Sequence, residues 1–440
     1  MKLTRYKLGE LIDVRRGASL SGEYYATEGD LIRLTLGNFD YQGGGFKDNT
    51  SKNDLYFVGP IKQEFILREG DIITPLTEQT PGLLGSTAQI PVSEKYIQSQ
   101  DVALIIPDES KLDKDFCYYL LPSKIVRQQL AAGAQQTKIR HTTPDRIKDL
   151  TVFIPALEDQ RGIGKLLKSI DRKIVLNREI NRNLEAMARQ LYDYWFVQFD
   201  FPDENGRPYK SSGGKMVWNE KLKREIPEYW RGGSMKDFLT ICNGKDHKDL
   251  DEGNYPVYGT GGLMRKVDAY LFEGESVLLP RKGSLSNYMY VNEAFWTVDT
   301  MFYTKERIKG AAKYIFLSLR YIDIARFDSG TGVPSMTSIA YYSIPFVYPT
   351  TKILEAFNKR ITPLLKQIKK FEKQISVLSK QRDELLSLLM NGQVSVMPSD
   401  VNCDLSMSIL ANLECQFCTY LSKVHLCLSF YLLYLHTSLT

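Results

Sequence analysis

The sequence predicts a mixed α/β (α+β) chain in which two similar globular modules alternate with two long helices. Apolar residues recur in alternating steps of four and three over two segments, as they do along the helices of a coiled coil. The two apolar rows coincide when one is shifted by 194 residues, which indicates an internal repeat. Short apolar runs bounded by Gly, Pro, Asn and Asp precede each row, and such runs are typical of strands.

The first apolar row predicts a helix over residues 156–199, which would form a rod of about 60 Å. Asn177 and Asn181 interrupt this row. Buried Asn in a coiled coil lowers stability and fixes the register or the number of helices. The alternative is that this part of the helix faces solvent. The apolar members expected at the helix–helix seam are Ile163, Leu167, Ile170, Ile174, Leu184 and Leu191.

The second apolar row lies in a helical segment expected over residues 350–392. Because proline removes one helical hydrogen bond and clashes with the preceding turn, Pro363 predicts a short helix that ends before Thr362 and a main helix from Pro363 to Met390. Gly392 is a suitable stop signal. The expected seam members are Phe357, Ile361, Leu364, Ile368, Phe371, Ile375, Leu378 and Leu385.

The first module is expected over residues 1–155. A helix is predicted over Asp113–Ala131, because its start is acidic and Gly133 follows its end. Strands are predicted at Leu31–Leu36, Phe65–Thr74, Val102–Ile106 and Leu150–Ile154.

The second module is expected over residues 215–349, after a turn-rich linker over residues 200–214. Residues 393–440 form a tail to which the sequence assigns no role. The residues between the motifs that the two modules share differ strongly, which is expected when one scaffold carries two different binding surfaces. The shared motifs pair residues 8–12 with 235–239, residues 69–73 with 273–277, and residues 153–155 with 347–349.

Composition indicates a folded protein of the reducing cytoplasm. The chain has 440 residues, a hydrophobic fraction of 43% and a net charge of +5, which permits nucleic-acid binding without requiring it. Cys117 and Cys242 are widely separated thiols rather than a disulfide framework. The N-terminus lacks the apolar run of a signal peptide. The apolar run from Leu426 to Leu435 is too short to span a membrane.

Motifs for catalysis and for bound cofactors are missing from the sequence. No phosphate-binding GxxxxGK[ST] loop is present, and no Asn-Pro-Pro-aromatic tetrapeptide of amino-group DNA methylation occurs. Cys415, Cys418, His425 and Cys427 are zinc ligands by type, but their spacing fits no common finger. We therefore expect no catalytic residue, no metal site and no cofactor in this chain.

Polar segments of both modules carry residue types that read DNA. Arg and Lys bind guanine or phosphate, Gln binds adenine, and Ser and Thr contact phosphates. The alternative for each segment is an ordinary solvated loop. The candidates are Arg15, Arg16, Gln135, Gln136, Lys138, Arg140 and His141 in the first module, and Lys245, His247, Lys248, Arg281, Lys282 and Ser335 in the second.

The order module, helix, module, helix resembles the specificity subunit of Type I restriction-modification enzymes. The run LTVFIPALEDQR over residues 150–161 is similar to the start of that family's first conserved helix, and residues 382–394 are similar to the end of its second. The second helix start, over residues 349–354, lacks the Gln of the first. The resemblance covers residues 1–396, and residues 397–440 have no counterpart in it.

The resemblance implies two target-recognition domains that read a bipartite, asymmetric DNA site, with the two helices packed as an antiparallel coiled coil between them. It also implies two methyltransferase subunits, and restriction subunits that join through them. S-adenosylmethionine and ATP would then belong to those partners. The other interpretation is a coiled-coil scaffold that joins two protein-binding modules and makes no DNA contact.

Overall fold

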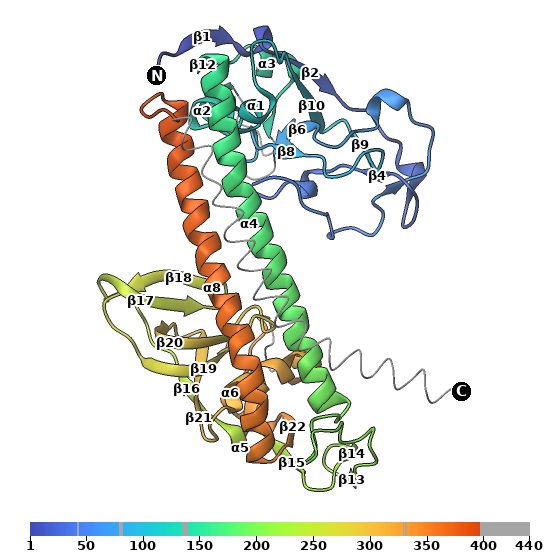
Figure 1. Ribbon diagram of the computed structural model, residues 1–440, viewed down its shortest axis with the longest axis vertical. Coiled ribbons are helices and arrows are strands. Elements are labelled where there is room, and N and C mark those ends of the chain that lie inside the picture. The colour runs from blue at the N-terminus through green and yellow to red at the C-terminus, as the bar shows by residue number, and fades with distance from the viewer. Residues whose placement is uncertain (42–43, 79–81, 134–139, 329, 331, 397–440) are drawn as a thin grey trace. The chain divides into compact units, whose positions relative to one another are not determined.

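The computed structural model describes residues 1–41, 44–78, 82–133, 140–328, 330 and 332–396. The chain divides into two compact units, of which unit 1 comprises Met1–Leu176 with Ile375–Thr440 and unit 2 comprises Asn177–Gln374. The two long helices, α4 (Leu157–Tyr192) and α8 (Thr351–Met390), each contribute one part to each unit (Figure 1).

Unit 1 is built around a four-stranded antiparallel sheet in the order β2-β10-β6-β8. Neighbouring residues of one strand face opposite cores: Ile72 packs with the helices, whereas Ile73 packs toward a second, smaller sheet. Burial on both faces explains why β6 is apolar without alternation. The bounds are β2 Ile12–Arg16, β10 Val102–Pro107, β6 Ile72–Pro75 and β8 Ala88–Gln89.

The remaining elements of unit 1 complete its two cores. The smaller sheet has the order β3-β5-β4-β9, and β1 pairs with β12 next to the start of α4. The strands of the smaller sheet are β3 Tyr25–Ala26, β5 Tyr56–Phe57, β4 Ile32–Arg33 and β9 Tyr96–Ile97. The other strands of unit 1 are β1 Thr4–Lys7, β12 Thr151–Ile154, β7 Thr77–Glu78 and β11 Arg140–His141. The short helices of unit 1 are α1 Lys114–Leu120, α2 Lys124–Gly133 and α3 Pro144–Lys148.

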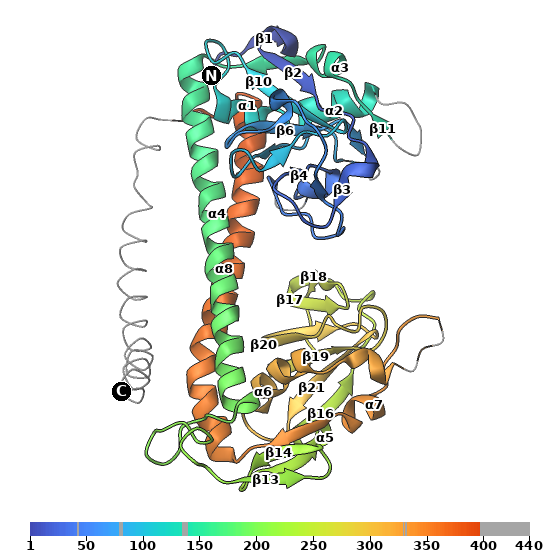
Figure 2. The ribbon, with the colours of Figure 1, turned by 90° about the vertical axis from the view of Figure 1, so that its right-hand side faces the viewer.

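Unit 2 contains a six-stranded sheet in the order β16-β21-β19-β20-β17-β18, in which only the β17–β20 pair is parallel among the described pairs. Its strands are β16 Leu239–Asn243, β21 Met301–Glu306, β19 Phe272–Pro280, β20 Met289–Thr297, β17 Glu252–Gly259 and β18 Gly262–Val267. The other elements are β13 Met216–Asn219, β14 Arg224–Pro227, β15 Arg231–Ser234, β22 Pro345–Tyr348, α5 Met235–Phe238, α6 Ala311–Ser318 and α7 Ser338–Ser343 (Figure 2).

The two units repeat one topology, which confirms the predicted fold class. The order β2-β10-β6-β8 corresponds to β16-β21-β19-β20, with every pair antiparallel. In each unit an early strand also pairs with the last strand, β1 with β12 and β15 with β22, directly before a long helix begins. The loop after β1 and the loop after β15 close in the same way: Glu10 accepts from the Lys7 backbone N–H, and Asp237 accepts from that of Ser234.

The two long helices pack in opposite directions within each unit. In unit 1, Ile163 near the start of α4 shares a core with Leu389 near the end of α8. In unit 2, Trp195 just beyond α4 meets Phe357 near the start of α8, with ring centroids 5.7 Å apart. Most of the seam is buried, whereas Leu191, Ile375, Leu378 and Leu385 are half-buried.

The two seam asparagines are buried, so the interpretation that this face meets solvent is wrong. Asn177 is 9% exposed and Asn181 is 8% exposed. The Nδ2 of Asn177 donates to Gln374 Oε1 across the seam at 3.4 Å. The Oδ1 of Asn181 accepts no hydrogen bond from any described residue. A buried amide of this kind lowers stability and restricts the register of the helices.

Two helix predictions differ from the structure, each at a proline. α8 runs from Thr351 to Met390 with Pro363 inside it, so the predicted break before Thr362 is wrong. Burial of Ile361 and Leu364 on either side holds the helix together despite the hydrogen bond that Pro363 lacks.

The helix predicted over Asp113–Ala131 is two helices, α1 and α2. They are separated at Pro122, where a proline ends the first helix and no comparable seam spans the gap.

Two strand predictions need much shorter bounds. The strand predicted at Leu31–Leu36 is confined to β4, because a 3-10 turn starts at Leu36. The strand predicted at Phe65–Thr74 is confined to β6, because a turn with positive φ at Gly70 precedes it. Tight turns of this kind leave no local apolar signal in the sequence.

Replacing Pro363 with Ala is expected to stabilise the chain by about 1–3 kcal/mol, because Ala restores the helical N–H and has the best helix propensity. Urea unfolding measures the change. Lys373→Ala, at an exposed position of the same helix, is the matched control and should shift stability by less than about 0.5 kcal/mol. A loss of stability in Pro363→Ala would show that the proline is required where it stands.

Candidate nucleic-acid interface

The positively charged candidates of unit 1 gather at one edge of its four-stranded sheet. Because β10 runs antiparallel to both β2 and β6, Arg16 lies opposite Ala103 at one end of β10 and Pro75 lies opposite Val102 at the same end. Arg15 and Arg16 end β2 at this edge, and the chain leaves β6 there toward β7. Both arginines are exposed.

The strand pair β7–β11 brings Arg140 and His141 to the same edge. Arg140 lies opposite Glu78 and His141 opposite Thr77, and the Thr142 N–H donates to the Leu76 carbonyl at 2.8 Å. This edge of Arg15, Arg16, Arg140 and His141 is named the basic edge of unit 1.

Glu78 holds the Arg140 guanidinium in place. Its side chain is 3% exposed, and its Oε2 accepts backbone N–H groups of Gly82, Leu83 and Leu84 at 2.8–3.1 Å. Its Oε1 lies 3.5 Å from Arg140 Nη1, whose side chain is 36% exposed. A half-exposed guanidinium oriented by a buried carboxylate suits directed contact with an acceptor.

Unit 2 has the equivalent edge at the ends of β16, β19 and β21. Asn243 lies opposite Phe302, and the next residues, Gly244 and Lys245, follow beyond the strand. The chain leaves β19 at Arg281 and Lys282, and Lys282 forms a β-bridge with Ser335. Arg281, Lys282 and Lys245 are exposed, and Ser335 is half-buried. These four residues are named the basic edge of unit 2.

Matching backbone hydrogen bonds show that the two edges are repeats of each other. The Leu76 N–H donates to Asp101 and the Arg281 N–H donates to Thr300, each at 2.8 Å. The Thr142 N–H donates to Leu76, and in the same way the Met336 N–H donates to Arg281 at 2.9 Å. One backbone frame therefore presents different side chains at corresponding places in the two units.

A glycine stands at the same point of each edge. The Gly17 N–H donates to the Val102 carbonyl, and the Gly244 N–H donates to the Met301 carbonyl. A Cβ atom at Gly17 would lie 2.3 Å from the Ser99 carbonyl oxygen, and one at Gly244 would lie 2.0 Å from that of Val298. Backbone packing therefore requires glycine where β2 and β16 end.

Some candidate side chains already have partners. Arg15 Nε lies 3.0 Å from Asp13 Oδ2, and Lys148 Nζ lies 2.7 Å from Asp13 Oδ1. Hydrogen bonds from Lys148 and then from Arg15 lower the pKa of Asp13. Arg16 Nε donates to the Gln100 carbonyl at 3.0 Å. These contacts hold both arginines close to the strand end.

The other candidates are placed less directly. His247 Nδ1 accepts from Arg265 Nε at 3.2 Å, so its ring is held against β18 beyond the edge. Lys248 lies 3.7 Å from Asp246 and is exposed. Gln135, Gln136 and Lys138 lie outside the described residues, as do the tail cysteines.

Glu78 and the two edge glycines were not predicted from the sequence. Gly17 follows Arg16 directly, and Gly244 follows Asn243. An alignment of the two modules would place these two glycines at the same position, and that match could have predicted them. Glu78 carried no such signal, because its partner Arg140 is distant in sequence.

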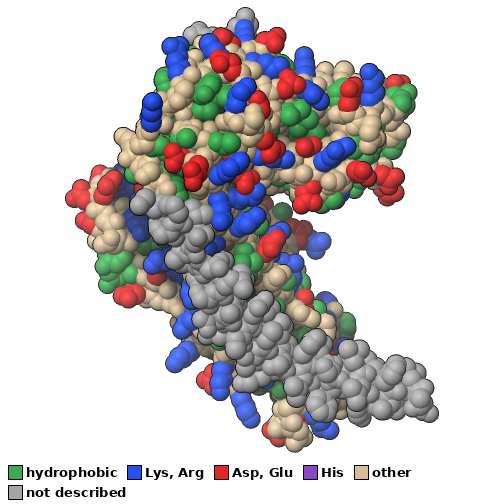
Figure 3. All heavy atoms as spheres, turned by 45° about the horizontal axis from the view of Figure 1, so that its top comes forward, with side chains coloured by type: hydrophobic (Ala, Val, Ile, Leu, Met, Phe, Trp, Pro, Cys, Tyr) green, Lys and Arg blue, Asp and Glu red, His purple; other side chains and the backbone are tan. Residues whose placement is uncertain are grey.

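Charge on the surface is mixed rather than segregated. Lys and Arg side chains are interspersed with Asp and Glu over the described surface that Figure 3 presents. Within the described part of the chain, no group of His, Cys, Asp and Glu side chains is arranged to hold a metal ion. None of the described helices has the length and apolar character needed to cross a membrane.

Comparison with known proteins assigns the family. A sequence model of the Type I restriction modification DNA specificity domain matches residues 2–186 and 227–381. The chain belongs to this family of specificity subunits. Both matched segments contain a sheet with its basic edge and most of a long helix.

Other specificity subunits are similar to the chain in sequence or in fold. The specificity subunit of the Type I restriction enzyme MjaIX from Methanocaldococcus jannaschii is 24% identical over 321 residues, which cover 66% of this chain and 71% of that protein. That of the HindI enzyme from Haemophilus influenzae is 30% identical over 109 residues, 24% of each chain. The solved S subunit from M. genitalium shares the fold, with a TM-score of 0.60 and 19% identity over 88% of this chain and 96% of that one.

The edge glycines of the specificity subunit give a test of the repeat. Gly17→Ala and Gly244→Ala are each expected to lower the free energy of unfolding by about 1–3 kcal/mol, because backbone must move to admit the Cβ. Gly22→Ala and Gly261→Ala are matched controls, since a Cβ meets its nearest atom at 3.9 Å in the first and nothing within 4 Å in the second. Equal unfolding curves for edge and control variants would contradict the shared close packing.

Proposed function

We propose that this specificity subunit is the non-catalytic DNA-reading component of a Type I restriction-modification complex and binds a bipartite, asymmetric DNA site. One observation carries the proposal: two units of one topology present different side chains at equivalent basic edges. A shared backbone frame with exchanged side chains suits two recognition domains that read two different half-sites.

The side chains at the two edges divide into two kinds of contact. Exposed Lys245 and Lys282 are flexible point charges that suit phosphates, which position a protein on the duplex. Arg140, oriented by Glu78, suits a base edge, where Arg reads the O6 and N7 acceptors of guanine. The mixture of positive and negative side chains on the face in Figure 3 favours local contact over a broad electrostatic footprint.

We further propose that the long helices set the distance between the two half-sites. At 1.5 Å per residue, the 36 residues of α4 extend about 54 Å and the 40 residues of α8 about 60 Å. The helical exteriors and module surfaces would receive two methyltransferase subunits, with restriction subunits joined through them. S-adenosylmethionine and ATP would act in those partners, in the cytoplasm where the host DNA lies.

Exchange of one module is the direct test of the bipartite site. Replacing residues 215–349 with the corresponding module of another specificity subunit should change one half of the methylated motif and leave the other half unchanged. Methylome sequencing of host cells with and without the gene reads the motif. A change in both halves, or in neither, would refute the modular assignment.

Single substitutions at the basic edges should weaken DNA binding. Lys282→Ala is expected to lower affinity for all duplexes alike and to reduce the salt-dependence slope by about 1, as loss of one phosphate contact does. Arg140→Ala is expected to cost about 1–3 kcal/mol and to relax discrimination at one base pair. Fluorescence anisotropy of the methyltransferase complex over a range of salt concentrations measures both.

Lys221→Ala, at an exposed position between β13 and β14, is the control for this series and should bind like the unmodified chain. Unchanged binding in all three variants would favour the scaffold interpretation, in which the modules never touch DNA.

A further inference from the structure

The two units differ at one shared topological position. In unit 1, β4 is parallel to β9 and antiparallel to β5; in unit 2, β17 is parallel to β20 and antiparallel to β18. The strands β17 and β18 are joined by Thr260 and Gly261 alone, whereas residues 34–55 join β4 to β5. The long β4–β5 connection is therefore an addition peculiar to unit 1.

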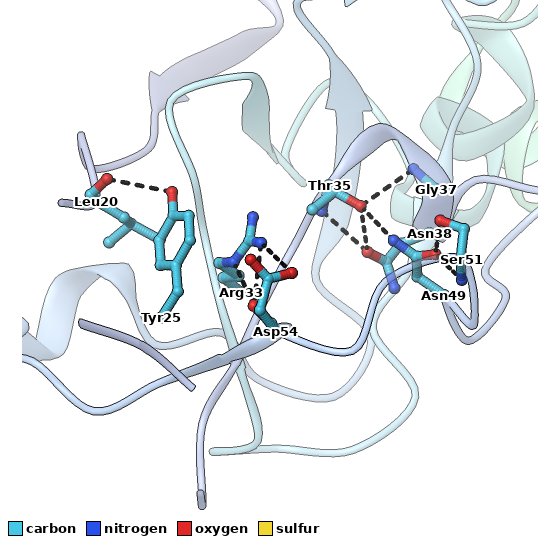
Figure 4. A network of polar contacts seen from close by, with 9 residues as sticks. All are labelled: Leu20, Tyr25, Arg33, Thr35, Gly37, Asn38, Asn49, Ser51 and Asp54. Atoms are coloured by element: carbon cyan, nitrogen blue, oxygen red, sulfur yellow. Dashed lines mark hydrogen bonds and ion pairs between the residues drawn. The ribbon is translucent and has the colours of Figure 1, made fainter. Parts of the chain in front are cut away.

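A hydrogen-bond network fixes this connection (Figure 4). Thr35 Oγ1 accepts from the Gly37 N–H at 3.2 Å and from Asn49 Nδ2 at 2.9 Å, and the Thr35 N–H donates to Asn38 Oδ1 at 2.9 Å. Ser51 Oγ donates to Asn49 Oδ1 at 2.6 Å. These bonds join residues near the two ends of the connection and therefore restrict its conformation.

Arg33, the last residue of β4, is held on two sides beside this network. It is 6% exposed, and its Nε and Nη2 donate to the Asp54 carbonyl at 3.2 and 3.0 Å. Its Cζ lies 3.7 Å from the centroid of the Tyr25 ring, and Tyr25 Oη donates to the Leu20 carbonyl. Its Nη1 makes no hydrogen bond that the structure records with a described residue. The guanidinium is therefore oriented, with one nitrogen left to bind elsewhere.

Arg33 lines a cavity of about 300 Å³. Its lining includes Thr35, Asn49, Ser51 and Lys52 of the β4–β5 connection, and Ala18, Ser99, Gln100 and Asp101 from outside that connection. Gln100 is the residue whose carbonyl accepts from Arg16, and Ala18 follows Gly17. The cavity thus lies next to the surface that the proposed function assigns to DNA.

We propose that Arg33 is a DNA-contacting residue of unit 1, whose Nη1 donates to an acceptor of one nucleotide that enters this cavity. The acceptor is an oxygen or nitrogen of a base edge or a phosphate oxygen, and both offer the same chemistry to a guanidinium. Asp54 and Tyr25 fix the guanidinium before binding, which removes the entropy cost of ordering it. In unit 2, Thr260 and Gly261 alone join β17 to β18 in place of this connection, so the effect is confined to one half-site. This inference rests on the proposed function.

Arg33→Lys in the full chain, bound to its methyltransferase subunits, tests the proposal. Binding is measured to duplexes that vary one half-site at a time. The variant should bind the cognate duplex about 5- to 100-fold more weakly, while discrimination at the half-site of unit 2 stays unchanged and shows that the complex is folded. Relaxed discrimination at one base pair of the half-site of unit 1 identifies a base acceptor; an equal loss of affinity for every duplex identifies a phosphate.

Lys52→Glu provides a second arm that leaves the Arg33 contacts in place, because Lys52 is exposed at the cavity wall. The added carboxylate should repel the nucleotide and weaken cognate binding, whereas Lys2→Glu, at an exposed position outside the cavity lining, should not. If Arg33→Lys disrupts folding, the comparison of Lys52→Glu with Lys2→Glu tests the inference instead. Cognate binding unchanged in Lys52→Glu, or in a folded Arg33→Lys, overturns the inference. Absence of any sequence preference in the unmodified complex would instead overturn the proposed function.

Discussion

Shared burial of the helix seam and the module core is the constraint on which the rest of the structure depends. In unit 1, Ile163 and Leu167 of α4 lie in the same core as Phe116 of α1 and Val152 of β12. In unit 2, Phe196 just beyond α4 contacts Tyr314 of α6 and Phe357 of α8, each at 4.8 Å between ring centroids. Long helices gain most of their stability from such packing. Each unit therefore folds as a helix pair together with its module.

Polar groups within the seams restrict how the helices pair. In unit 1, Arg382 Nη1 lies 3.0 Å from Asp171 Oδ1, and Tyr119 Oη donates to Asp171 Oδ2 at 2.6 Å, which links α8, α4 and α1. The Arg382 side chain is 12% exposed, so a shifted register would leave a buried charge without its partner. In unit 2, the pair of Asn177 and Gln374 has the same effect. An apolar seam alone would tolerate slippage by a heptad, and these pairs oppose it.

Sequence reasoning predicted the features that depend on local periodicity and on the internal repeat. The heptad rows gave both helices, and the matching motifs gave the repeated topology. It was wrong about Pro363 because a buried seam outweighs a local helix breaker, and it overlooked Pro122 because the flanking residues read as one helix. Contacts between distant residues were beyond its reach: Arg33 with Asp54, Glu78 with Arg140, and Gly17 against Ser99 all depend on the tertiary fold.

Hydrogen–deuterium exchange of the methyltransferase complex, with and without its cognate duplex, tests the central claim most directly. If two equivalent edges read one bipartite site, protection should rise together at residues 15–18 and 140–142 in unit 1 and at residues 243–245 and 281–284 in unit 2. A duplex altered in one half-site should remove the protection from one unit alone. Protection confined to the helices, or equal protection by cognate and altered duplexes, would contradict the account.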